Sequence, residues 1–180
     1  MSTLIRLLNE EEEALARVPD LCDVLCDCVD GGASVGFMAP LADADAVAYW
    51  RGVASAVGRN EVLLLVAEDD VGRVMGTVQV GFALKPNQPH RADLMKLLVH
   101  RAARGRGLSR LLMMAAEQEA MERGRWLLVL DTATGEPAEA IYERFGWVRS
   151  GVVPDYALFP DGRYCATTIF YKRLTPAADV

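Results

Sequence analysis

Histidine is scarce in this sequence, and so is every arrangement of side chains that usually holds a metal ion. The 180 residues include two histidines and four cysteines, and no two cysteines have the Cys-x-x-Cys spacing. A structural zinc site needs four ligands at workable spacing, so we predict no metal site. We expect the cysteines to be buried or half-buried thiols in a reducing compartment. They are Cys22, Cys26, Cys28 and Cys165.

An excess of positive charge is also missing. The net charge is −6, whereas nucleic-acid-binding domains usually carry an excess of basic charge. The arginine-rich stretch HRAARGRGLSRLL (residues 100–112) is the segment that suggests such a partner. Its four arginines would neutralise only a few phosphates, which is a small footprint against a net charge of −6. We therefore expect no nucleic-acid partner.

Long apolar runs are absent too. A run such as VLLLVA (residues 62–67) is far shorter than the roughly 20 residues that a membrane-spanning helix needs. The first residues, MSTLIRLLNEEEE, turn acidic within ten positions, which is not the pattern of a signal peptide. We expect no membrane partner and a cytoplasmic location. The length and the 52% hydrophobic content indicate one globular domain over residues 1–180.

Periodicity along the chain predicts an α/β domain. A helical pattern follows the first strand, with Asn9 as its N-cap and a break or restart at Pro19. A second helix begins at Asp43 or Asp45 and runs through Val57. Later helical patterns cover residues 107–123 and 136–146. Residues 94–131 form a strand, a loop, a helix and a strand. The predicted strands are residues 3–8, 61–68, 73–84, 92–100, 126–132, 147–153 and 163–174.

The loop RGRGLS (residues 104–109) lies between a predicted strand and a predicted helix. The first turn of a helix has unpaired N–H groups and the positive end of the helix dipole, so it favours anions. Glycines allow the backbone to approach an anion closely. The loop is not a Walker A loop, and Arg110 stands where a dinucleotide fingerprint has its third glycine. The pattern indicates an anion site, and a glycine turn with solvated arginines remains the alternative.

Two segments resemble one known family. The segment VHRAARGRGLSRLL (residues 99–112) resembles the Arg/Gln-x-x-Gly-x-Gly/Ala signature of the GNAT superfamily of N-acyltransferases, through Arg104, Gly107 and Ser109. The segment AEAIYERFGW (residues 138–147) resembles the family's Ala-x-x-x-Tyr-x-x-x-Gly-Phe pattern. The resemblance implies a single-domain GNAT fold. That fold is a mixed, mostly antiparallel sheet with a splayed parallel strand pair at its centre, flanked by about four helices.

The resemblance also implies acetyl-CoA as co-substrate. It assigns the pyrophosphate to the backbone of the loop, that is to Arg104, Gly105, Arg106, Gly107, Leu108 and Ser109. It assigns the polarisation of the thioester carbonyl to free backbone N–H groups around Leu97, Leu98 and Val99. Ser109 departs from the usual glycine or alanine. Gly135 stands where many members have asparagine, which puts one side-chain contact to cofactor or substrate in doubt.

Catalytic groups follow from the same resemblance. Asp93 and Asp131 are the predicted bases that remove a proton from the acceptor's ammonium group, directly or through water. Tyr142 is the predicted acid for the departing thiolate. The alternatives are a solvated residue at a strand start for Asp93, a turn cap for Asp131 and an aromatic core residue for Tyr142.

The acceptor is predicted to be the primary amine of a small molecule. The segment GGASVGFM (residues 31–38) and other short stretches resemble the tabtoxin-resistance acetyltransferases, which act on an amino-acid-like toxin. We expect Val35, Phe37 and Met38 to line a compact acceptor pocket. Antibiotics and toxins are candidate substrates. The alternatives are an acetyltransferase for proteins or peptides and a non-catalytic acyl-CoA-binding sensor. Family members are often dimers, so a homodimer is compatible with the sequence.

Overall fold

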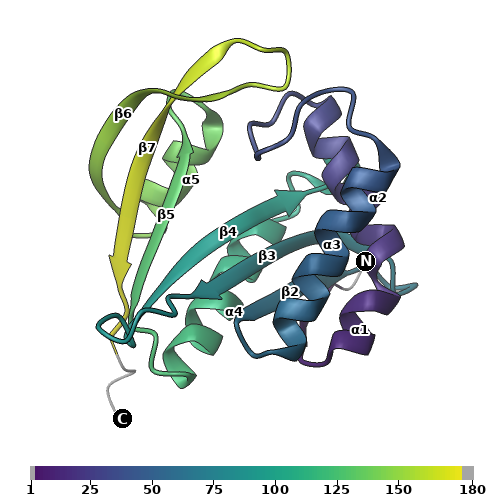
Figure 1. Ribbon diagram of the computed structural model, residues 1–180, viewed down its shortest axis with the longest axis horizontal. Helices are drawn as coiled ribbons and strands as arrows, with labels where there is room; N and C mark the ends of the chain where they lie inside the picture. Colours follow the sequence, from purple (N-terminus) through teal and green to yellow (C-terminus); the bar gives the residue numbers. More distant parts are fainter. Residues whose placement is uncertain (1–2, 176–180) are drawn as a thin grey trace.

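The structure, a computed structural model, describes residues 3–175 of the chain (Figure 1). Its strands form one seven-stranded sheet in the order β1-β2-β3-β4-β5-β7-β6. The strands are β1 (Leu4–Leu8), β2 (Val62–Glu68), β3 (Val74–Phe82), β4 (Arg91–Val99), β5 (Leu127–Ala133), β6 (Val148–Leu158) and β7 (Tyr164–Arg173). The helices are α1 (Glu11–Ala16), α2 (Val18–Asp30), α3 (Asp43–Gly58), α4 (Leu108–Glu122) and α5 (Pro137–Arg144), with a 3₁₀ turn at Arg101–Ala103. This is the predicted mixed α/β fold.

Three details differ from the sequence-based expectation. The described residues contain five α-helices rather than about four, because the first helical segment divides at Arg17, just before Pro19. The N-cap of α1 is Glu10, without a side-chain cap, rather than Asn9. Strand β6 continues to Leu158, beyond Pro154. A proline is tolerated there because β6 is an edge strand that pairs only with β7, and the register shifts at that point.

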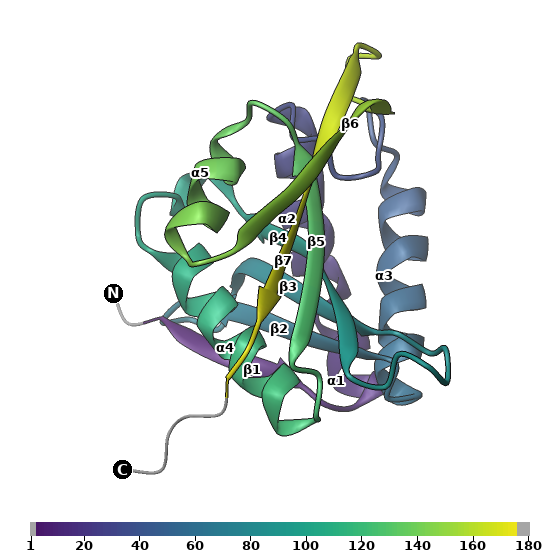
Figure 2. The same cartoon turned by 90° about the vertical axis from the view of Figure 1, so that its left-hand side faces the viewer.

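The helices cover both faces of the sheet (Figure 2). Helices α4 and α5 pack on one face, where the buried side chains include Leu94, Leu112 and Phe170. Helices α1, α2 and α3 pack on the other face, where the core includes Trp50 and Leu98. These two apolar layers fix the sheet between them and hold its central strands in place.

The central strands β4 and β5 are parallel and remain paired for only a short distance. Their register joins Arg91 to Leu127 and Asp93 to Val129, and no pairing follows beyond these residues. The two strands then diverge (Figure 1). Because β4 has no partner strand on this side beyond Asp93, its later backbone groups remain available to a ligand. The predicted splayed parallel pair is therefore confirmed.

A β-bulge interrupts β4 within this divergent part. The register against β3 shifts between Thr77, which lies opposite Leu98, and Gln79, which lies opposite Met95. Lys96 lies inside the bulge with a φ of +50°. A bulge changes the direction of the side chains that follow it. Accordingly Leu94 belongs to the core beneath α4, whereas Leu98 belongs to the core beneath α2 and α3.

Candidate active site

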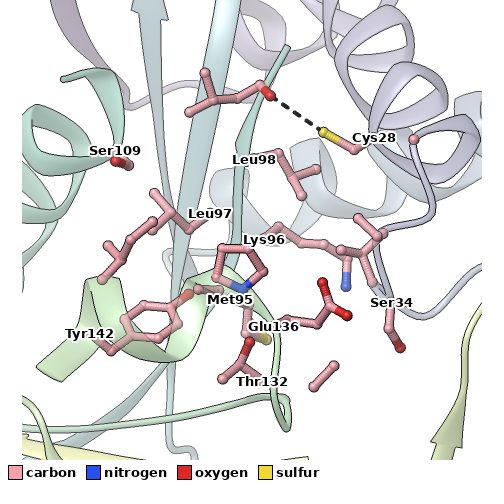
Figure 3. Close-up of a pocket in the computed structure, with 18 of the residues that line it drawn as sticks. Cys28, Ser34, Met95, Lys96, Leu97, Leu98, Ser109, Thr132, Glu136 and Tyr142 are labelled. Carbon is pink, nitrogen blue, oxygen red and sulfur yellow. Dashed lines mark hydrogen bonds between the residues drawn. The ribbon is translucent and has the colours of Figure 1, made fainter. Parts of the chain in front are cut away.

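A cavity of about 710 Å³ lies where β4 and β5 diverge. Its walls are the second half of β4, the start of α4, the end of β5, the start of α5, the segment 31–36 and part of the β6–β7 hairpin. Figure 3 shows that side chains from several of these elements converge on it, among them Lys96, Tyr142 and Glu136. This volume is in the range of ordinary small-molecule sites.

One end of the cavity has the features of an anion cradle. Gly105 and Gly107 both have left-handed backbone conformations, with φ of +77° and +76°. A Cβ at either position would meet no other atom within 4 Å, so the space in front of the loop is open. Gly107 is the N-cap of α4 and makes no side-chain cap. The N–H groups of the first turn therefore point to an accessible site that favours an anion.

The arginines of the loop have different roles. Arg104 lines the cavity, and its Nε donates to the carbonyl oxygen of Val99 at 3.3 Å. Arg106 does not line the cavity, and it donates to the carbonyl oxygen of Ala102 at 3.1 Å. Arg101 instead binds Asp27 of α2 through its backbone N–H and its Nε, at 2.7 and 2.9 Å. The sequence-based prediction assigned both Arg104 and Arg106 to the cradle; of these two residues, Arg104 lines the cavity.

The link to Asp27 holds the loop against α2. Burial alone would raise the pKa of Asp27, but the hydrogen bonds from Arg101 hold that pKa below its ordinary value. Next to it, the Cys28 thiol donates to the carbonyl oxygen of Val99 at 3.7 Å. Burial raises the pKa of Cys28, so this thiol is a packing group rather than a nucleophile. Two neighbouring residues of α2, Asp27 and Cys28, thus hold the end of β4 and the loop that follows it.

The other predicted cofactor positions line the same cavity. Leu97, Leu98 and Val99 contribute the divergent part of β4, and Leu108 and Ser109 contribute the first turn of α4. A ligand could therefore reach from the free backbone of β4 to the glycine loop without leaving the cavity. The residues present fit an acyl-CoA thioester with its pyrophosphate on the loop.

Asp131 and Tyr142 also face the cavity. Asp131 Oδ2 accepts a hydrogen bond from the Thr167 hydroxyl at 2.9 Å. Tyr142 is buried, with its ring near those of Trp147 and Phe170. Burial, with a smaller contribution from the Asp131 charge, raises the pKa of Tyr142 to about 12. The phenol is therefore protonated at neutral pH. Tyr142 is both a core aromatic residue and a cavity residue, so the two interpretations of it are compatible.

The structure does not bring Asp93 into the cavity lining. Asp93 lies at the last paired position of β4 and β5, and its carboxylate forms an ion pair with Arg91 at 2.5 Å. Its side chain is 41% exposed. The two predicted bases therefore differ in position: Asp131 lies beyond the point where the strands separate, and Asp93 lies at that point.

Lys96 is a cavity residue that the sequence analysis missed. Its ammonium nitrogen lies 5.9 Å from the ring centre of Phe37 and 5.5 Å from that of Tyr49. Burial lowers the pKa of Lys96, and the charge of Asp131 acts in the opposite direction. One signal was available in the sequence, because Lys96 is the single charged residue in the apolar run LMKLLV (residues 94–99).

The predicted acceptor residues are only partly in place. Val35 lines the cavity, whereas Phe37 and Met38 do not. Phe37 packs edge-on against Tyr49 with ring centres 5.2 Å apart. Its ring also lies near the ammonium of Lys96, which lines the cavity. Met38 is 45% exposed. Neither side chain therefore lines the cavity directly, because Phe37 packs against Tyr49 of α3 and Met38 is exposed; their contact with an acceptor stays a prediction.

The segment 31–39 is bonded to the tip of the β6–β7 hairpin. The Ser34 hydroxyl donates to the carbonyl oxygen of Leu158 at 3.1 Å, and the Ala39 N–H donates to that of Pro160 at 3.1 Å. In Figure 1 the segment after α2 and the hairpin tip approach each other across the divergent strands. The acceptor side of the cavity is therefore bridged.

Among residues 3–175, no helix is long and apolar enough to cross a membrane. The same residues contain no group of three or more histidine, cysteine, aspartate or glutamate side chains that could hold a metal ion.

Cys28 and Cys165 are buried, and Cys22 and Cys26 are half-buried; all four are free thiols. The predicted burial or half-burial of the cysteines is therefore confirmed.

Comparison with known proteins identifies similarity to acetyltransferases. The model of the acetyltransferase (GNAT) family matches residues 20–147. An uncharacterized N-acetyltransferase from the hisH-hisA intergenic region of Azospirillum brasilense is 37% identical over 114 residues, which are 62% of this chain and 66% of the relative. The chain thus spans just under two thirds of the length of that curated relative.

Solved structures agree over nearly the whole chain. A ribosomal-protein-alanine N-acetyltransferase from Brucella melitensis is 25% identical with a TM-score of 0.79, covering 95% of this chain and 99% of that one. The structure of yncA from Salmonella typhimurium, solved with its cofactor acetyl-CoA, is 19% identical with a TM-score of 0.78, covering 100% and 98%. Together with the splayed β4–β5 pair and the glycine loop at α4, the family match shows that this chain belongs to the GNAT family of acetyltransferases.

Proposed function

We propose that this protein transfers the acetyl group of acetyl-CoA to the primary amine of a small molecule. The observation that carries the choice of a small acceptor is the bridge between the segment 31–39 and the β6–β7 hairpin, formed by Ser34 and Ala39. A peptide acceptor needs an open groove through which the chain can continue. A bridged cavity instead encloses most of a small ligand.

Acetyl-CoA supplies an activated acetyl thioester when it is bound. The first turn of α4, with Gly105, Gly107 and Ser109, would hold the pyrophosphate through backbone N–H groups. Free N–H groups of β4 at Leu97–Val99 would donate to the thioester oxygen, where negative charge develops during transfer. A protein of the same fold has been solved with acetyl-CoA bound, which supports acetyl-CoA as the acetyl donor.

Asp131 is the group we assign to remove the proton from the acceptor's ammonium. It lines the cavity, and the hydrogen bond from Thr167 fixes the direction of its carboxylate. A carboxylate in this position also attracts the positively charged amine before the reaction. Asp93 remains a second prediction. It lies outside the cavity lining and is paired with Arg91, so its participation requires a relay through water.

Tyr142 is the group we assign to protonate the departing thiolate. Its phenol carries a proton at neutral pH, as an ordinary tyrosine does, and burial raises its pKa further, to about 12. The residue lines the cavity on the α5 side. Neighbouring rings at Trp147 and Phe170 hold its position. The proton transfer makes a modest contribution, since a thiolate is a fairly good leaving group.

The proposal also covers the class of acceptor, the cellular location and the oligomeric state. The resemblance of residues 31–38 and neighbouring stretches to the tabtoxin resistance protein supports an amino-acid-like toxin or antibiotic as acceptor. The four free thiols fit a reducing, cytoplasmic location. A homodimer remains a prediction that sedimentation equilibrium tests.

The decisive experiment measures the release of free CoA thiol with acetyl-CoA and a panel of primary amines, amino acids and short peptides. We expect release with at least one small amine and none with the peptides. Release with peptides alone would show that the enzyme modifies proteins. Stabilisation of the protein by acetyl-CoA without any thiol release would indicate a sensor, because any ligand of the native state raises the melting temperature.

A further inference from the structure

Lys96 carries a charge that the described part of the protein does not neutralise by contact. Among residues 3–175, its ammonium has no hydrogen bond and no carboxylate within 4.0 Å. Its nearest neighbours are the rings of Phe37 and Tyr49, 5.9 and 5.5 Å from the nitrogen. These distances are near the outer limit of a cation–π contact, which contributes only modestly. A half-buried ammonium without a partner is unfavourable, so its position needs a reason.

A strained backbone conformation directs the Lys96 side chain into the cavity. A strand without a bulge would place Lys96 on the same face as Leu94, in the apolar core beneath α4. The bulge and the φ of +50° at Lys96 turn the side chain to the opposite face, beside Phe37 and Tyr49. Residues other than glycine seldom adopt this backbone conformation, and such strain is concentrated at functional sites.

The surroundings hold the ammonium in that place. The Tyr49 hydroxyl is 3.0 Å from the Gln79 side-chain nitrogen, which fixes the ring beneath Lys96. Gly36 lies beside the ammonium, since a Cβ there would be 3.8 Å from the Lys96 nitrogen, an ordinary contact distance. Lys96 is thus surrounded by residues of α3 and of the segment 31–39 rather than extended into solvent.

Two carboxylates, Asp131 and Glu136, line the same cavity and give it an opposite charge. Asp131 is near enough to act on the pKa of Lys96, yet neither carboxylate forms an ion pair with Lys96 within 4.0 Å. A separated pair of opposite charges best accommodates a ligand that carries both charges in the reverse order. A zwitterion would place its ammonium toward Asp131 and its carboxylate toward Lys96. A simple amine would satisfy Asp131 and leave Lys96 without a partner.

We infer that Lys96 binds a carboxylate of the acceptor, so that the substrates are amino acids or molecules of the same chemistry, with a primary amine and a carboxylate a few bonds apart. This inference rests on the proposed function, since it specifies which small amines the enzyme acetylates. Lys96 is then the residue that determines specificity, whereas Asp131 and Tyr142 act on the protons.

The test compares matched substrates. Thiol release from acetyl-CoA is measured with the common L-amino acids, β-alanine and γ-aminobutyrate, and each active acid is compared with its amide and with the amine that lacks the carboxylate. The wild-type protein should prefer the acid. A hydrogen bond to a charged group contributes about 1.5–3 kcal/mol, so the ratio of kcat/KM for acid and amide should be about 10–150.

Three variants separate recognition from structure. Lys96→Met should bring the acid-to-amide ratio close to one, mainly through the KM of the acid, and leave turnover of the amide within about threefold. Lys96→Arg should restore much of the ratio because it keeps the charge. Lys85→Met, at an exposed lysine outside the cavity, should change nothing.

The other possible outcomes contradict either the role of Lys96 or the proposed function. A wild-type enzyme that acetylates neutral amines as readily as acids contradicts the role of Lys96 and leaves the proposed function intact. The same holds if Lys96→Met reduces acid and amide turnover equally, since that result indicates a structural role. Transfer to peptides alone, or to no amine at all, contradicts the proposed function itself and the inference with it.

Discussion

Replacing Gly107 by alanine tests the anion cradle. Gly107 has a φ of +76°, and a Cβ there would meet nothing within 4 Å. The substitution therefore creates no clash, and its effect on folding is the backbone strain of a left-handed alanine, about 1 kcal/mol. For a domain of this size, 1 kcal/mol lowers the melting temperature by roughly 2–4 °C.

Binding of acetyl-CoA should suffer much more than folding. The added methyl group would stand at the N-cap of α4, where the pyrophosphate must approach the backbone N–H groups. Loss of one hydrogen bond to a charged group costs about 1.5–3 kcal/mol, which raises Kd about 10- to 150-fold. Isothermal titration calorimetry with acetyl-CoA measures this change, and thermal unfolding measures the strain.

The chain offers a matched control in Gly124, at the other end of α4. It has a φ of +73°, and a Cβ there would also meet nothing within 4 Å. Gly124→Ala should therefore destabilise the protein as much as Gly107→Ala but leave acetyl-CoA binding unchanged. If the two variants bind acetyl-CoA equally well, the pyrophosphate does not lie on this loop and our reasoning about the cradle is refuted.

Further predictions concern the proton route and the buried lysine. Asp131→Asn should lower kcat by about 10²–10⁴, and a loss of less than tenfold in Asp93→Asn would leave the route with Asp131 alone. Tyr142→Phe should lower kcat with little change in acetyl-CoA affinity; a collapse of that affinity would assign Tyr142 to packing. Lys96→Met should raise stability at pH 7 by about 1 kcal/mol. Because the pKa of Lys96 is lowered in the folded state, this gain should shrink as the pH rises toward the ordinary lysine pKa of about 10.4, and unfolding curves at several pH values measure it.

The fold could be predicted from the sequence because local patterns specify its elements. Alternation and helical periodicity identified the strands and helices, and Gly105 and Gly107 marked the strand-to-helix loop. Errors occurred where a long-range contact decided the outcome. Strand β6 extends past Pro154 because it lies at the sheet edge, and position in the sheet is not a property of the local sequence.

The sequence by itself identified the glycine loop before α4 and the tyrosine segment, because both depend on backbone freedom and spacing over a few residues. The tertiary structure decided which charged side chains share the cavity. Strands β4 and β5 stop pairing after Asp93, so Asp131 lies in the cavity and Asp93 does not. The bulge against β3 turns Lys96 to the same cavity. Both results depend on strand register, which is set by packing between segments far apart in the chain and leaves no local pattern.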